Sequence, residues 1–321
     1  MSTQRDIFIN ELFNYAKNDK NVIMISVDMG APSLDQWREK LPDQFIAAGI
    51  SEQNAINVAA GLSAEGKKVY VYFMASWVAR CFEQIRYSCC MGNNPITIIG
   101  NGIGLGYAPA GPAHSPTEDI AYMRSLNNIE IITPANLNFI KSLVNLTYYT
   151  SKLRYIRLER STAKQTDKLY SQLMSSELID NGLSLIKPGL SEFIGRPKLA
   201  IISSGYMLGR SIDVSNKLFE LDGRIENCVF DLWKIKPFNT GYFNLLVDEF
   251  THIVTIEEQS LDAGFGSAVY ECLLDNQKSI KTLRIGLPSQ FIFKNGSREQ
   301  LLDANGLSVD SIYAKIKTFV R

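Results

Sequence analysis

The sequence predicts an α/β protein of two domains, each built on a mainly parallel sheet covered by helices. Short apolar runs rich in Val, Ile and Tyr alternate along the chain with longer segments of helical periodicity. This alternation is typical of parallel strands joined by helices. The chain has 321 residues, of which 45% are hydrophobic, so it is long enough to bury two cores.

The first half of the chain contains five expected strands. They are residues 22–27, 68–73, 96–99, 129–132 and 154–158. Between them, residues 53–65 and 77–91 place apolar side chains at helical spacing, which predicts two covering helices. We therefore expect residues 1–165 to form the first domain.

A polar stretch without clear periodicity follows at about 161–180, and the linker is predicted at 166–190. Four more strands are expected at 199–203, 227–230, 252–256 and 281–285. Residues 191–321 should therefore form a second, smaller α/β domain. The sequence contains neither a repeat of solenoid length nor a low-complexity segment.

Composition and charge exclude several classes of function. Lys and Arg total 33, as do Asp and Glu, so no overall field attracts nucleic acid or an anionic membrane. The five cysteines match neither a zinc site nor a disulfide framework. The N-terminal residues do not resemble a signal peptide, and no apolar run is long enough to span a bilayer. We expect a cytoplasmic protein that binds neither nucleic acid nor membranes.

The most informative segment is 48–86, AGISEQNAINVAAGLSAEGKKVYVYFMASWVARCFEQIR. A strand is expected to end before Gly49 and a helix to begin near Glu52. The Glu52 carboxylate would then lie at the edge of the sheet where α/β proteins commonly bind ligands. Local chemistry alone favours a simpler interpretation, in which Glu52 is a first-turn residue stabilised by the helix dipole.

This segment resembles the pyrimidine-binding domain of transketolases and of 1-deoxyxylulose-5-phosphate synthase, and more distantly the β subunit of 2-oxoacid dehydrogenases. The resemblance implies thiamine diphosphate as cofactor and a catalytic function for Glu52, which matches the Glu that bonds to a ring nitrogen of the aminopyrimidine. A carboxyl group can share a proton with that nitrogen and promote the imino tautomer. A glutamine would hold the ring without activating it.

Further cofactor contacts are implied by the same resemblance. Trp77 stands where transketolases carry a Phe that packs on the pyrimidine, and an aromatic plane suits an aromatic ring. Met74 replaces a second aromatic residue, and Arg80 matches the synthase in place of the Tyr typical of transketolases. Asp28 and Ile50 are also assigned to the cofactor site. An alternative for Trp77 is an ordinary core position in the helix that follows.

The glycine-rich loop 100–116, GNGIGLGYAPAGPAHSP, contains no phosphate-binding lysine and is weak evidence by itself. It resembles the transketolase substrate loop, and this implies that His114 contacts substrate and takes part in catalysis. The other histidine, His252, enters an expected strand and is predicted to be structural. Ala110 replaces an Asp that recognises a sugar hydroxyl in the family, so we expect an altered substrate preference.

Four residues are candidates for a substrate phosphate. Ser33, in DMGAPS, resembles the family Ser that meets the phosphate, and Arg5 lies where a phosphate-binding Arg is found. Arg160 matches another such Arg, with Arg157 as a competing alignment. The arginine fork suits a phosphate or a carboxylate, although each of these arginines is also explained as an ordinary surface charge.

Residues 230–237 and 257–267, FDLWKIKP and EEQSLDAGFGS, resemble the C-terminal domain of transketolases, which mainly supports the dimer in that family. The GDG motif of the diphosphate-binding domain does not occur in the sequence. The resemblance therefore implies a partner subunit that binds the diphosphate through Mg2+ or Ca2+, in an α2β2 assembly. No metal ligand is expected on this chain.

The implied activity is a transferase that moves a two-carbon ketol unit from a ketose to an aldehyde and works only with the partner subunit. Three alternatives remain open at the level of sequence. They are a pyruvate-decarboxylating enzyme like deoxyxylulose-phosphate synthase, a 2-oxoacid dehydrogenase β subunit, and a catalytically degenerate scaffolding subunit.

Overall fold

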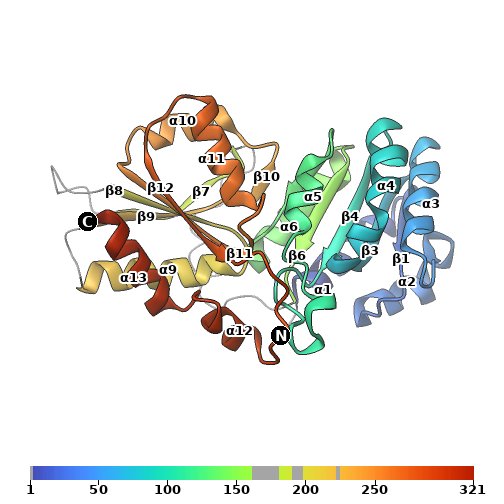
Figure 1. Cartoon of the computed structure of the whole chain (residues 1–321). Helices are drawn as coiled ribbons and strands as arrows, with labels where there is room; N and C mark the ends of the chain where they lie inside the picture. The colour runs from blue at the N-terminus through green and yellow to red at the C-terminus, as the bar shows by residue number, and fades with distance from the viewer. Residues whose placement is uncertain (1–2, 161–180, 190–197, 222–224) are drawn as a thin grey trace.

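The structure is a computed structural model that describes residues 3–160, 181–189, 198–221 and 225–321. Within these ranges the chain forms two α/β domains side by side, each around its own sheet (Figure 1). The seven strands of the first sheet lie in the order β10-β5-β6-β4-β3-β1-β2, and the five strands of the second in the order β12-β11-β8-β9-β7.

The first sheet contains six parallel strands, and β10 pairs antiparallel with β5 at its edge. Its strands are β1 (Val22–Ser26), β2 (Phe45–Ala47), β3 (Lys68–Met74), β4 (Ile96–Asn101), β5 (Glu130–Ile132), β6 (Arg154–Leu158) and β10 (Lys234–Lys236). Its helices are α1 (Gln4–Ala16), α2 (Asp35–Lys40), α3 (Glu52–Ala64), α4 (Phe82–Gln84), α5 (Asp119–Ser125) and α6 (Leu137–Tyr149).

The five strands and the helix at 53–65 predicted for this domain are confirmed. The helix predicted at 77–91 is helical throughout but composite, because α4 lies between a 3-10 segment, Ala75–Cys81, and a π-helical segment, Ile85–Met91. Helices α3 and α5 cover one face of the sheet, while α1, α2 and α6 cover the other.

The second sheet is parallel except for β7, which pairs antiparallel with β9. Its strands are β7 (Ser184–Lys187), β8 (Lys198–Ser203), β9 (Glu226–Asp231), β11 (His252–Ser260) and β12 (Lys281–Leu287). Its helices are α9 (Met207–Leu221), α10 (Thr240–Val247), α11 (Phe265–Asp275), α12 (Arg298–Ala304) and α13 (Val309–Val320). Helices α10 and α11 cover one face, and α9 and α13 cover the other (Figure 1).

Sheet membership crosses the predicted domain boundaries at two edge strands. Strand β7 lies inside the predicted linker 166–190, whose residues 166–180 and 190 are outside the described ranges. Strand β10 belongs to the predicted second domain but pairs with β5 of the first sheet. Both strands are short edge strands, and their pairing depends on tertiary packing more than on local pattern.

The two domains share one apolar core. The largest buried cluster contains Ile25 and Val71 of the first sheet together with Ile202 of the second, and Phe265 of α11 extends it. Burial of apolar surface across the junction favours a single relative arrangement of the domains. Among the described residues, no helix combines the length and apolarity needed to cross a membrane.

His252 lies at the start of β11, as expected for a structural residue. Its side chain is buried, its Nδ1 lies 2.9 Å from Thr251 Oγ1, and its ring packs edge-on against Phe319. Burial lowers the pKa of this imidazole, and nearby Lys281 adds to the shift. The neutral ring is therefore favoured at this position.

The Glu257 carboxylate accepts a backbone hydrogen bond from the first turn of α11. Its Oε1 accepts a hydrogen bond of 3.1 Å from the Gly266 amide, and its side chain is fully buried. Burial raises the pKa of Glu257 to about 8, against the opposing influence of the Gly266 and Phe265 amides. The folded chain therefore holds a proton on Glu257 more tightly than the unfolded chain does.

We predict that Glu257 makes the protein less stable as pH rises. Because its folded pKa is raised, this stability is complete below the ordinary carboxyl value of 4.5 and is lost as pH rises toward about 8. The free energy of unfolding in urea should fall by about 1 kcal/mol per pH unit in this window. Glu257→Gln should flatten this dependence, whereas Glu271→Gln, at an exposed position, should not. An unchanged slope in Glu257→Gln would contradict the assignment.

Candidate functional site

The candidate site lies at the carboxyl edge of the first sheet. Because β1 to β6 run parallel, the segments after them emerge at one edge, where α/β folds bind ligands. Glu52 begins α3 shortly after β2, and Met74 ends β3. Asn101 ends β4 and leads into the loop that carries His114, while Arg160 follows β6.

Glu52 is a buried carboxylate at the first position of α3. Its side chain is 4% exposed, and its Oε2 lies 3.3 Å from Nη1 of Arg80, which is itself 54% exposed. That oxygen has no hydrogen-bond partner among the residues that the structure describes. Buried polar atoms are rarely left without a partner, so this oxygen is suited to a hydrogen bond with a ligand.

Trp77 and His114 lie next to each other although they come from 3-10 segments that follow different strands, β3 and β4. Their ring centroids are 5.6 Å apart at an interplanar angle of 66°, an edge-to-face arrangement that aromatic rings favour. Trp77 also packs partly against the core. His114 Nδ1 is buried and, within the described ranges, has no hydrogen-bond partner. The site thus combines an aromatic surface with an available ring nitrogen.

Arg5 and Ser33 are joined by Asp6, a residue that the sequence analysis did not identify. Ser33 Oγ donates to Asp6 Oδ1 at 2.9 Å, and Arg5 Nε donates to the same oxygen at 3.0 Å. Burial alone would raise the pKa of Asp6, but hydrogen bonds from Arg5, Thr3 and Ser33 hold it below its ordinary value. The signal in the sequence is the cap of α1, in which Thr3 accepts from the Asp6 amide.

Arg160 is exposed and lies over the ring of Tyr107, with the guanidinium carbon 4.6 Å from the ring centroid. The Tyr107 hydroxyl accepts from Asn101 Nδ2 at 3.0 Å. Asn101 Oδ1 is buried with no partner in the described part of the chain. Sequence reasoning missed both Asn101 and Tyr107. The glycine at 102 is required, because a Cβ there would lie 1.9 Å from the Tyr107 ring.

The remaining cofactor candidates lie around this edge. Met74 is partly buried, Asp28 is exposed with a positive φ of 35°, and Ile50 is 72% exposed.

Arg157, a candidate for the substrate phosphate, differs from these residues. It points into the protein, is 1% exposed, and donates to Asp119 through two nitrogens at 2.7 and 2.9 Å and to Thr133 Oγ1 at 3.0 Å. These bonds occupy its guanidinium, so we omit Arg157 from the proposed site.

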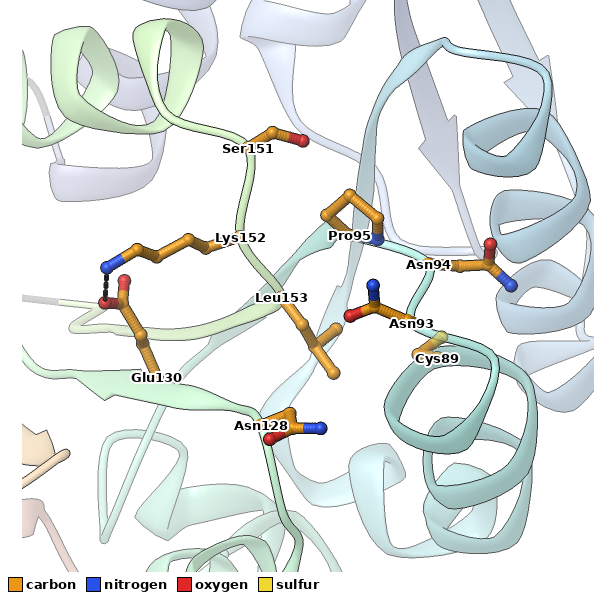
Figure 2. A pocket seen from close by; sticks show the side chains of 9 residues that line it. All are labelled: Cys89, Asn93, Asn94, Pro95, Asn128, Glu130, Ser151, Lys152 and Leu153. Atoms are coloured by element: carbon orange, nitrogen blue, oxygen red, sulfur yellow. Dashed lines mark hydrogen bonds and ion pairs between the residues drawn. The ribbon is translucent and has the colours of Figure 1, made fainter.

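A separate pocket of about 480 Å³ opens at the opposite edge of the sheet (Figure 2). It lies where β4, β5 and β6 begin, and Lys152 donates to Glu130 across its wall at 3.0 Å. Its lining residues are Cys89, Asn93, Asn94, Pro95, Asn128, Glu130, Ser151, Lys152 and Leu153. None of the candidate residues lines this pocket. In the described ranges, no group of three or more His, Cys, Asp or Glu side chains has an arrangement that could hold a metal ion.

The family models agree with the fold of the two domains. The model for the transketolase pyrimidine-binding domain matches residues 2–165, and that for the transketolase C-terminal domain matches residues 195–312. The chain belongs to the transketolase family, and its first domain is a pyrimidine-binding domain of the type found in thiamine-diphosphate-dependent enzymes.

Among curated relatives, the chain is 26% identical to one of the subunits of the apulose-4-phosphate transketolase of Phocaeicola vulgatus, over 99% of this chain and 97% of that protein. It is 27% identical to 1-deoxy-D-xylulose-5-phosphate synthase of Pseudoalteromonas translucida, over 99% of this chain and 48% of the synthase. The chain therefore spans about half the length of the synthases that it matches.

Solved structures give the same result for the fold. A split gene transketolase, described as an inactive β4 tetramer, aligns over the whole of both chains with a TM-score of 0.83 and 25% identity. A transketolase of Pichia stipitis aligns over 99% of this chain and 46% of that chain, with a TM-score of 0.78 and 17% identity. The second likeness is evidence for the fold alone.

We predict that Arg157 stabilises the fold and does not bind substrate. Arg157→Leu leaves the fully buried Asp119 without its guanidinium partner, which should cost about 3–5 kcal/mol in the free energy of unfolding. Arg38→Leu removes an ion pair with exposed side chains and should cost much less. Chemical denaturation of both variants checks this. Wild-type stability in Arg157→Leu, together with a raised KM, would restore Arg157 to the substrate site.

Proposed function

We propose that the chain is the pyrimidine-binding and C-terminal subunit of a split transketolase that transfers a two-carbon ketol unit from a ketose to an aldehyde. The observation that carries the proposal is the buried Glu52 carboxylate, whose Oε2 lacks a hydrogen-bond partner among the described residues. The match to the apulose-4-phosphate transketolase polypeptide supports the split organisation, because that relative is itself a subunit and aligns over nearly its full length.

The residues present fit the pyrimidine end of thiamine diphosphate. Glu52 would accept or share a proton at a ring nitrogen, since its free oxygen is held in a buried site. Trp77 would provide an aromatic surface, while Met74, Arg80 and the segments of Asp28 and Ile50 would complete the rim. When bound, the cofactor supplies the electron sink for cleaving a carbon–carbon bond.

The substrate would lie beside this position. We assign His114 to hydrogen bonding with substrate hydroxyls, because its Nδ1 is available next to Trp77. Arg160 extends into solvent at the same edge, and Arg5 and Ser33 form a polar group around Asp6. Arginine forks with a serine hydroxyl are suited to a phosphate. Asn101 and Tyr107 add further polar atoms to this side of the site.

A partner subunit is proposed to bind the diphosphate through Mg2+ or Ca2+, with two copies of each chain in the enzyme. The likeness to a split gene transketolase supports a partner, since that structure is described as an inactive β4 tetramer. The chain has five free cysteines, four of them buried, which suits the reducing cytoplasm that we propose as its location.

The second candidate is a transfer that begins with the decarboxylation of pyruvate. It is favoured by the 27–29% identity to 1-deoxy-D-xylulose-5-phosphate synthases and by Arg80, the residue that matches the synthases and approaches Glu52. The two candidates share Glu52 and the cofactor and differ in the donor substrate.

We predict that Glu52→Gln abolishes most transfer activity in the complex with the partner subunit. Loss of the exchangeable proton should lower kcat by about 10²–10⁴-fold, because the amide keeps the size of the side chain without its acid–base function. Glu65→Gln, an exposed position at the other end of α3, is the matched control. The thermal midpoints of both variants should match wild type. Near-normal turnover in Glu52→Gln would overturn the function assigned to it.

The donor can be determined with the same reconstituted complex. We expect transfer to an aldehyde acceptor from a ketopentose or its phosphate, and no release of carbon dioxide from pyruvate. Arg160→Ala should raise KM for a phosphorylated ketose about tenfold or more and leave that for the unphosphorylated sugar nearly unchanged, since it removes a charge-assisted contact. Carbon dioxide release from pyruvate would establish the second candidate instead.

A further inference from the structure

We propose that the C-terminal domain positions the substrate loop, with Glu258 and Arg298 acting as positioning residues for His114 and Arg160. The importance of this contact for catalysis rests on the proposed function. Strand β11, which carries Glu258, ends at the junction of the two domains beside the first sheet (Figure 1).

The Glu258 side chain holds the backbone of the loop that carries His114. Its Oε1 accepts a hydrogen bond of 3.0 Å from the amide of Leu105, a fully buried residue in the loop between β4 and His114. The loop approaches so closely at Gly104, which has a φ of +55°, that a Cβ there would lie 2.7 Å from Glu258 Cδ. Glycine satisfies both the backbone conformation and the close approach.

Arg298, at the start of α12, connects this contact to Arg160. Its Nε donates to Glu258 Oε1 at 2.7 Å, and its Nη1 donates to Glu159 Oε2, also at 2.7 Å. The other oxygen of Glu159 accepts from the Tyr206 amide at 3.0 Å. Glu159 directly precedes Arg160 in the chain. The Arg298 guanidinium therefore holds both the loop, through Glu258, and the backbone next to Arg160.

A second hydrogen bond from β11 holds the loop at a residue that follows His114 in the chain. The Ser260 amide, at the end of β11, donates to the Thr117 carbonyl at 2.8 Å. Glu258 and Ser260 therefore anchor the loop before and after His114 from the same strand. A loop fixed at both ends holds its functional side chain with less freedom, which favours a productive geometry.

The contact consists of three buried, charged side chains. Glu159, Glu258 and Arg298 are 2%, 4% and 8% exposed. Burial raises the pKa of Glu258, while Arg298 opposes the shift. A buried ion cluster contributes little net stability, because the cost of desolvation offsets the attraction. The guanidinium fork instead fixes the orientation of both carboxylates, as a positioning contact requires.

Hydrogen exchange of the loop tests the contact without any assay of activity. Arg298→Lys keeps the charge but loses the fork, so exchange in peptides covering 100–117 should rise about tenfold. The matched control is Arg210→Lys, because Arg210 pairs with Glu299 and Asp303 of the same helix α12. Exchange that is unchanged in Arg298→Lys, or raised equally in both variants, would overturn the proposal.

Kinetics of the complex with the partner subunit test the consequence for the site. Arg298→Lys should raise KM for both substrates about tenfold, while the Kd for thiamine diphosphate stays within about twofold, because the loop faces the substrate. Glu258→Gln, which keeps an oxygen for the Leu105 amide, should be impaired less than Glu258→Ala. If Arg298→Lys raises hydrogen exchange in the loop but leaves KM unchanged, the positioning function is wrong. A wild-type complex inactive with both ketoses and pyruvate would overturn the proposed function, while hydrogen exchange would still decide whether the contact exists.

Discussion

The main physical constraint on the candidate site is the burial of a carboxylate oxygen that has no hydrogen-bond partner among the described residues. Removing such an oxygen from water costs free energy unless another group satisfies it. The turn through Gly49, at a φ of +66°, leads to Glu52 at the start of α3, and Arg80 provides a nearby charge but no hydrogen bond. A ligand with a ring nitrogen, such as the cofactor proposed above, would supply the missing partner.

The second domain contributes directly to the packing of the first. It shares the largest apolar core with the first domain and adds strand β10 to its sheet. It also contacts the loop that carries His114 through Glu258 and Ser260, and it contacts Glu159 through Arg298. These contacts combine non-directional apolar burial with directed hydrogen bonds, so that the first fixes the domains and the second fixes the loop.

The side of the candidate site that we propose for the substrate departs from the family pattern. Ala110 lacks the carboxylate expected to recognise a sugar hydroxyl, while Tyr107 fills the space over Gly102 and supports Arg160. Asn101 links this tyrosine to the end of β4 and keeps a buried oxygen available. The candidate site therefore presents amide, phenol and guanidinium groups in place of a carboxylate.

Local pattern in the sequence determined the two α/β domains, most of their strands, and the position of Glu52 at the start of a helix. These features depend on the periodicity of a few neighbouring residues and on short motifs, both of which are visible along the chain. Only the tertiary structure shows that Arg157 is buried against Asp119 while Arg160 is exposed. The link from Arg5 through Asp6 to Ser33, and that from Glu159 through Arg298 to Glu258, also appeared only there. Each joins residues far apart in the chain, whose contact depends on how the domains and loops pack.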